Sequence, residues 1–168
     1  MYSDQYATAA ADTAERRLPN VHEAREGLFW DFLRGSSPQP PAATTLGWRL
    51  VDVDPDHGTI EVELTAREDF LNPVGVVQGG FLAAMLDDTL GPALVATLGP
   101  GQFAPTLDLQ VQFHRPAHPG VVLGRGRVVR RTRDIAFLGG ELCDAAGAIV
   151  ATATATAMIR NVERSAPR

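Results

Sequence analysis

Two adjacent carboxylates, Asp87 and Asp88, lie inside an otherwise apolar segment of this 168-residue chain. Aspartate is a poor residue for the interior of a helix, and burying its charge without a partner costs free energy. A carboxylate held in apolar surroundings can serve as a general base or as a nucleophile. The pair alone leaves two interpretations open: a catalytic site, or a solvated helix face that carries both acids.

Pro92 follows this pair and bears on the choice. Proline cannot donate a hydrogen bond to the backbone carbonyl four residues earlier, which here belongs to Asp88. The sequence therefore predicts a kink near Asp88–Gly91. Two acids beside a kink favour the interpretation as a site.

A second group of residues precedes the acidic segment. Gly79 and Gly80 are expected at a helix N-terminus, where unpaired amides at the positive end of the helix dipole bind anions or stabilise an oxyanion. Asn72 lies in the loop before them. The alternative for both features is plain turn chemistry.

The elements that must position these residues follow from hydrophobic periodicity. Residues 81–98 are apolar nearly all round and predict a buried helix. Antiparallel strands are expected at 46–53, 59–65, 103–114, 121–131, 135–143 and 148–159. One apolar helix and an antiparallel sheet pack economically when the sheet curls round the helix, which predicts an α+β fold.

The N-terminal part adds a further helix. Asn20 and Glu23 have the spacing of a capping box, and an apolar stripe covers 28–33. Gly35 ends that helix, and the prolines within 38–41 predict a stiff connector. We expect a flexible segment at 1–18, a single domain at 19–161 and a flexible tail at 162–168.

Composition excludes several kinds of chemistry. The chain has no lysine, so a Schiff base, a P-loop lysine and a Ser–Lys dyad are impossible. Its net charge of −5 argues against nucleic-acid binding. Cys143 is the single cysteine, and His114 and His118 straddle a proline in a poor arrangement for zinc. Without a secretory start or a long apolar run, we expect a cytoplasmic protein that does not enter membranes.

The spacing of the chemical residues resembles a known active-site segment. In the hotdog-fold thioesterases of the phenylacetic-acid-degradation (PaaI-like) branch, an Asn or Gln is followed by His-Gly-Gly and then by an acid. Asn72, Gln78-Gly79-Gly80 and Asp87 stand at those offsets. The segment that opens with Thr106 resembles the next strand of the family, whose opening Ser or Thr also reaches the site.

This resemblance implies a fold and an activity. The fold is the hotdog: an antiparallel sheet wrapped around one long central helix, here with an extra N-terminal helix. The activity is hydrolysis of an aryl- or medium-chain acyl-CoA thioester to the free acid and coenzyme A, without a metal or other cofactor. The assembly implied is a homodimer with shared active sites, and a dimer of dimers as homotetramer.

The resemblance also implies roles. The Gly79 amide would polarise the thioester carbonyl, and Asn72 would hold that carbonyl or the attacking water. Asp87 would be the general base, or the nucleophile that forms a mixed anhydride, and Thr106 would orient the water or Asp87. Gln78 replaces the family's histidine, which excludes imidazole proton transfer in this chain.

The remaining assignments concern the substrate. Gln78, Gly80 and Phe81 are expected to bind the acyl-CoA, and Arg131 and Arg133 its phosphates, because guanidinium pairs bidentately with phosphate. Two alternatives to the thioesterase remain: a non-catalytic acyl-CoA or aromatic-ligand binding protein, and a hotdog dehydratase. The dehydratases pair an Asp with a His.

Asp88 competes with Asp87 for the catalytic role. Consecutive helical side chains diverge by about 100°, so we expect only one of the two to face the substrate. Asp87 alone stands at the family's offset, which leaves Asp88 as a supporting or solvent-facing acid.

Overall fold

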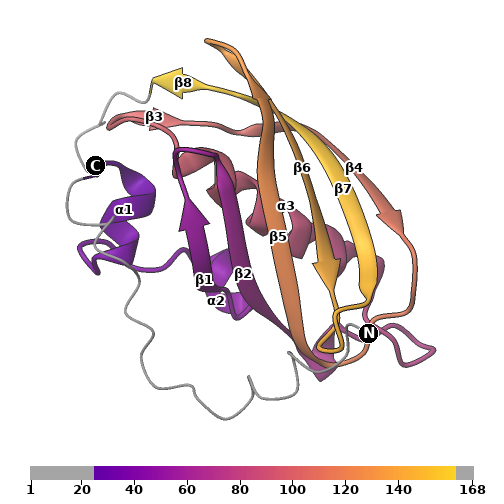
Figure 1. Cartoon of the computed structure of the whole chain (residues 1–168). Coiled ribbons are helices and arrows are strands. Elements are labelled where there is room, and N and C mark those ends of the chain that lie inside the picture. The colour runs from indigo at the N-terminus through magenta and orange to yellow at the C-terminus, as the bar shows by residue number, and fades with distance from the viewer. Residues whose placement is uncertain (1–24, 162–168) are drawn as a thin grey trace, which may run out of the picture.

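Six antiparallel strands form a curved sheet, and one long helix packs against its inner face (Figure 1). This computed structural model describes residues 25–161. The strands are β1 (Arg49–Asp54), β2 (Thr59–Ala66), β4 (Thr106–Phe113), β5 (Gly120–Arg131), β6 (Ile135–Cys143) and β7 (Ile149–Met158). Their order in the sheet is β1-β2-β5-β6-β7-β4, which leaves β1 and β4 at the edges. The predicted α+β hotdog architecture is confirmed.

The long helix is α3 (Gly79–Val95). It buries the stripe formed by Leu82, Met85, Leu86, Thr89, Leu90, Ala93 and Leu94, which recurs every three to four residues. Its opposite face, at Gly80, Ala84 and Asp87, is exposed in the single chain. The sheet of one chain therefore covers only one side of a helix that the sequence predicts to be buried all round.

Glycines in the sheet set how closely α3 approaches. A Cβ added at Gly126 of β5 would lie 2.9 Å from the Thr89 carbonyl oxygen. Because that neighbour is backbone, any larger residue at this position would push the helix away from the sheet. Glycine at position 126 therefore allows α3, which carries both acids, to lie close to the sheet.

The N-terminal elements differ from the prediction. Residues 25–27 are not helical, and α1 (Leu28–Leu33) begins only after Gly27, whose φ is 127°. The stiff connector contains a short helix, α2 (Pro41–Thr45), because proline is well accommodated at the first helical position. The predicted Asn20–Glu23 capping box, the flexible segment 1–18 and the tail 162–168 lie outside the described residues.

The strand predicted at 103–114 is two strands. Pro105 separates β3 (Gln102–Phe103) from β4, and β3 pairs instead with β8 (Arg160–Asn161). A 3-10 turn, η2 (Glu68–Phe70), precedes the loop that leads into α3. Among the described residues, no helix is long and apolar enough to cross a membrane.

Candidate active site

Asp87 and Thr106 meet where α3 lies beside the first residue of β4. Thr106 Oγ1 donates a hydrogen bond of 2.8 Å to Asp87 Oδ1. No described residue donates to Asp87 Oδ2, so this oxygen can take a proton from water or attack a carbonyl carbon. The two residues come from the acidic segment and from the strand that the sequence analysis singled out.

A cavity of about 690 Å³ opens beside this pair, and we call it the Asp87 cavity. Asp87, Asp88 and Thr106 all contribute to its lining. Both acids line the cavity, although consecutive helical side chains diverge by about 100°. The reason is that the cavity follows the side of α3 from Asp87 to Val95, so that adjacent helix positions both reach it.

Asp88 is the half-buried member of the acidic pair, whereas Asp87 is exposed. Its Oδ2 is buried and has no hydrogen-bond partner among the described residues. Burial, and then the neighbouring charge of Asp87, raise the pKa of Asp88 from 3.8 to about 6. Of the two alternatives for Asp88, a supporting or a solvent-facing acid, the structure favours the supporting one, because its Oδ2 is buried at the cavity wall.

The backbone carbonyl of Asp88 has an unusual partner. Pro92 has no amide to donate to it, and the indole Nε1 of Trp48 donates to it instead, at 2.9 Å. Trp48 is buried and stands just before β1. Pro92 in the sequence indicated that the Asp88 carbonyl would lack its helical donor, but nothing in the sequence indicated that Trp48 would donate to it.

The N-terminus of α3 is a separate group. Gln78 is the N-cap and makes no capping bond through its side chain. Within residues 25–161, the amides of Gly79 and Gly80 donate no hydrogen bond, which leaves them available to an oxyanion. The ring of Phe113, on β4, lies 3.1 Å from where a Cβ of Gly79 would be. Phe113 was not anticipated, since only the register of β4 on β7 brings it there.

Asn72 shapes the loop before this helix. Its Oδ1 accepts hydrogen bonds from the amides of Val74 and Val76, at 3.0 and 3.3 Å. The side-chain amide donates to no described residue, so it can donate to a substrate carbonyl. Phe81 stacks on Phe70 with ring centroids 4.0 Å apart, and its ring supports the start of α3.

The site residues thus form two groups in one chain. Asp87 and Thr106 line the Asp87 cavity, whereas Asn72, the Gln78–Gly80 segment and Phe81 do not. Gly79 and Asp87 are eight residues apart on one helix, which places them about 12 Å apart along its axis.

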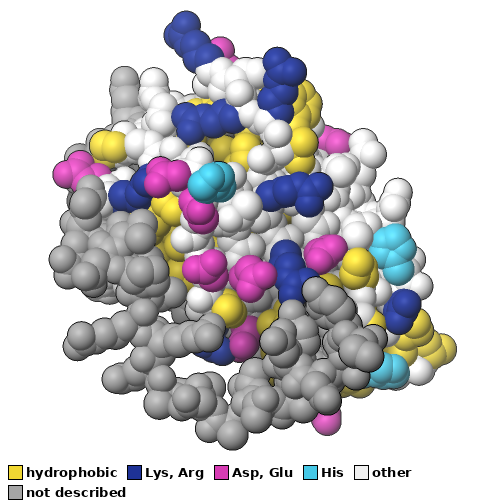
Figure 2. Space-filling model, viewed as in Figure 1, with side chains coloured by type: hydrophobic (Ala, Val, Ile, Leu, Met, Phe, Trp, Pro, Cys, Tyr) yellow, Lys and Arg dark blue, Asp and Glu magenta, His cyan; other side chains and the backbone are white. Residues whose placement is uncertain are grey.

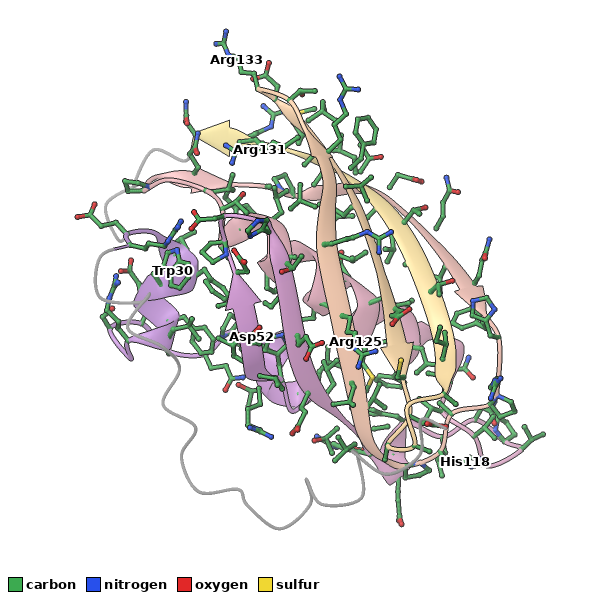
Figure 3. The ribbon with its side chains drawn as sticks, in the orientation of Figure 1. Trp30, Asp52, His118, Arg125, Arg131 and Arg133 are labelled. Carbon is green, nitrogen blue, oxygen red and sulfur yellow. The ribbon has the colours of Figure 1, made fainter. Side chains whose placement is uncertain are left out.

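The arginines lie elsewhere. Figure 3 shows Arg131 and Arg133 at the end of the β5–β6 hairpin and Arg125 in the middle of the outer face of the sheet. Arg131 Nη1 donates to Thr97 O and Oγ1, at 3.1 and 3.2 Å. Arg133 projects into solvent with 94% of its side chain exposed, 3.7 Å from Asp134.

The outer face of the sheet carries interspersed charges (Figure 2). Arg125 pairs there with Glu61 and Glu141, in a groove of about 520 Å³ that contains none of the predicted site residues. His114 Nε2 is bonded to Thr152 Oγ1 at 2.8 Å. The described residues contain no cluster of His, Cys, Asp or Glu suited to a metal ion.

Replacing Asp88 by Asn is expected to stabilise the protein at pH 8 but not at pH 4. In the folded protein the pKa of Asp88 is about 6, above its ordinary value of 3.8. Between pH 3.8 and about pH 6 the native state therefore binds more protons than the unfolded state, and the free energy of unfolding falls as the pH rises through this range. The pKa shift corresponds to a loss of at most about 3 kcal/mol in the free energy of unfolding, and partial solvent screening of Asp88 reduces this loss to roughly 1 kcal/mol. Thermal melts should show Tm higher by about 2–4 °C at pH 8.

The exposed neighbour supplies the control for that measurement. Asp87→Asn should change Tm by little at either pH, because surface substitutions usually alter stability by about 0.5 kcal/mol or less. If Asp88→Asn raised Tm equally at pH 4 and pH 8, burial of the Asp88 charge would not be the cause of the stabilisation.

Comparison with known proteins places this geometry in context. A family model described as the thioesterase superfamily matches residues 74–151. The chain is 47% identical to a phenylacetic acid degradation-related protein from Ralstonia eutropha JMP134, with a TM-score of 0.75 over 77% of this chain and 98% of that one.

Two more distant solved structures share the fold. The PaaI protein of the phenylacetic acid degradation operon of E. coli is 19% identical, with a TM-score of 0.68 over 77% of this chain and 91% of that one. A thioesterase from Haemophilus influenzae is 19% identical, with a TM-score of 0.70 over 84% of this chain and 97% of that one.

Proposed function

The chain is a thioester hydrolase that belongs to the thioesterase superfamily, and we propose that its substrate is an aryl- or medium-chain acyl-CoA, hydrolysed to a free acid and coenzyme A. The observation that carries this proposal is the hydrogen-bonded pair of Asp87 and Thr106 at a cavity of about 690 Å³, which is large enough for an acyl group. Coenzyme A enters as part of the substrate, so no resident cofactor is required.

Asp87 can carry the reaction in two ways. As a general base, its carboxylate takes a proton from water while the water oxygen adds to the thioester carbonyl carbon. The C–S bond then breaks, and the CoA thiolate takes the proton from Asp87. As a nucleophile, Asp87 Oδ2 itself attacks the carbonyl and expels the thiolate, and water then hydrolyses the mixed anhydride.

The oxyanion formed in either route needs donors. The unpaired amide of Gly79 lies at the positive end of α3, and the side-chain amide of Asn72 is free to donate. Because these donors lie far from Asp87 along the same chain, we propose that a second subunit supplies them. The edge strand β4, with Leu107 and Phe113 more than half exposed, is suited to pair with a second copy.

A direct assay tests the proposal. The purified protein is incubated with acetyl-, decanoyl-, benzoyl- and phenylacetyl-CoA, and free CoA is followed with a thiol reagent. Steady release beyond one equivalent supports the hydrolase. Tight binding without release would favour the non-catalytic ligand-binding protein, and a changed acyl chain with its thioester intact would favour the dehydratase.

The arginine assignment predicts a salt effect. If Arg131 and Arg133 bind CoA phosphates, raising the salt concentration should increase KM and leave kcat nearly unchanged, because exposed ion pairs are screened. Arg133→Ala should increase KM several-fold at low salt, since its guanidinium is the freer of the two. Arg125→Ala is the matched control, because Arg125 already pairs with two glutamates. An unchanged KM in both Arg131→Ala and Arg133→Ala would place the CoA phosphates elsewhere.

A further inference from the structure

The Asp87 cavity is mainly apolar, and its polar lining residues are the two acids, Ser37 and Thr106. Its walls come from α1, from the segment at 37–40, from Trp48, from the last two turns of α3 and from the segment at 103–106. The aromatic side chains among them are Phe29, Phe32, Trp48 and Phe103. Phe32 packs edge-on against Trp48, with ring centroids 5.7 Å apart. At about 690 Å³, the cavity has the size of a site for a ligand much larger than an acetyl group.

Gly91 is a glycine in the interior of α3, and its presence in this wall needs an explanation. It lies one helical turn beyond Asp87, on the same side of α3, and it lines the cavity. A glycine inside a helix costs about 1 kcal/mol relative to alanine. Unlike Gly126, it has no close neighbour, since an added Cβ would meet nothing within 4 Å. Its missing side chain therefore serves no packing contact and keeps space open next to the carboxylates.

We propose that the Asp87 cavity holds the acyl group, and that the space beside Gly91 makes the enzyme select medium-length apolar chains over short ones. This inference rests on the proposed function and narrows its substrate class. A thioester carbonyl near Asp87 Oδ2 would direct its acyl chain past Gly91 toward Val95 and Phe32. The chain would leave water for an apolar wall, which is favourable for every methylene buried.

Much of the selecting wall comes from the N-terminal part of the chain. Helix α1, the segment at 37–40 and Trp48 all precede residues 74–151, which are the part that matches the thioesterase superfamily. Within the matched part, Asp87 and Thr106 provide the chemistry. The N-terminal helix thus has a role in substrate choice rather than in the reaction itself.

A chain-length series tests the inference. With acetyl- through hexadecanoyl-CoA, kcat/KM should rise by up to about four-fold per methylene, the equivalent of about 0.8 kcal/mol for each CH2 buried, and then level off at medium length. A flat profile in an active enzyme would overturn the acyl pocket and leave the proposed function intact. No CoA release from any ester would instead count against the function.

Substitutions at the wall make the test specific. Gly91→Leu should lower kcat/KM for decanoyl-CoA at least about ten-fold, because overpacking displaces the chain, and should spare acetyl-CoA. Phe32→Ala enlarges the cavity and should shift the preferred length upward. An identical length profile in wild type, Gly91→Leu and Phe32→Ala would overturn the proposal.

A competing reason for Gly91 is that it precedes Pro92, where any Cβ is sterically disfavoured in a helix. Gly91→Ala separates the two: the pocket predicts a higher Tm, because alanine favours the helix more than glycine, with an unchanged length profile, whereas the proline explanation predicts a lower Tm and an equal loss for all esters. The non-hydrolysable S-decyl-CoA gives a readout without turnover. It should bind Gly91→Leu at least about ten-fold more weakly than wild type, while S-methyl-CoA binds both alike. Equal affinities of S-decyl-CoA for both proteins would contradict the pocket.

Discussion

Asp87→Asn is expected to lower kcat by at least about 100-fold without unfolding the protein, since this is the usual scale of a lost general base or nucleophile. The amide keeps the size of the side chain and can still accept from Thr106. It can neither take a proton from water nor attack the carbonyl carbon. Steady-state kinetics with the best acyl-CoA ester, together with a thermal melt, measure both parts of this prediction.

Asp88→Asn is the matched control, because the same change is made one residue along the same helix. It should retain most of the activity, since Asp88 has no bond to Thr106 and its carboxyl is held against the cavity wall. If Asp88→Asn were the inactive variant and Asp87→Asn stayed active, the assignment of the catalytic carboxylate would have to be reversed.

A mixture of two inactive variants, Asn72→Ala and Asp87→Ala, should recover about one quarter of wild-type activity when subunits exchange. The Gly79 amide lies about 12 Å from Asp87 along α3, and Asn72 stands in the loop before that helix, whereas reacting atoms must approach to about 3–3.5 Å. A partner helix running antiparallel along the exposed face at Gly80, Ala84 and Asp87 would bring its own Asp87 to this Gly79. Symmetry then gives two shared sites per dimer.

The expected fraction follows from counting sites. In a mixed dimer one site carries both lesions and the other carries neither, and random exchange makes about half of the dimers mixed. Activity is measured after mixing, and exchange is verified by mass spectrometry of differently tagged subunits. Verified exchange with no recovered activity would show that each site is built within one chain.

The contact between Thr106 and Asp87 supplies an internal control. Both residues belong to the same chain, so they act in the same site. Mixing Thr106→Ala with Asp87→Ala should therefore recover nothing, because every site of a mixed dimer carries one of the two lesions. The same reasoning applies to the proposed dimer of dimers, as long as each active site involves one pair of subunits.

The parts of this site that the sequence predicted are those that depend on spacing along one element. The offsets of Asn72, Gly79 and Asp87 could be read directly, and the resemblance added Thr106. The depth at which Asp88 is held, and its raised pKa, depend on how α1 and Trp48 pack against α3. Those contacts join segments that are far apart in the chain, and no local pattern encodes them.

In the sheet, too, the local pattern predicted the strands, whereas contacts between distant segments could not be predicted. Alternation located every strand of the main sheet, but the break at Pro105 and the pairing of β3 with β8 depend on where the chain end returns. The ring of Phe113 reaches Gly79 only through the register of β4 on β7. The alternation of side chains along a strand indicates which face of the sheet a residue occupies. The pairing register with a distant strand decides which residues it contacts.

The close contact between Gly126 and the Thr89 backbone has a consequence for redesign. Because backbone meets backbone there, repacking the side chains cannot bring α3 closer to the sheet at this point. A protein engineer can therefore treat the helix and its carboxylates as a fixed platform. The walls supplied by α1 and by the segment at 37–40 attach to this platform from outside the sheet, so they can be exchanged for other acyl groups while the reacting atoms keep their places.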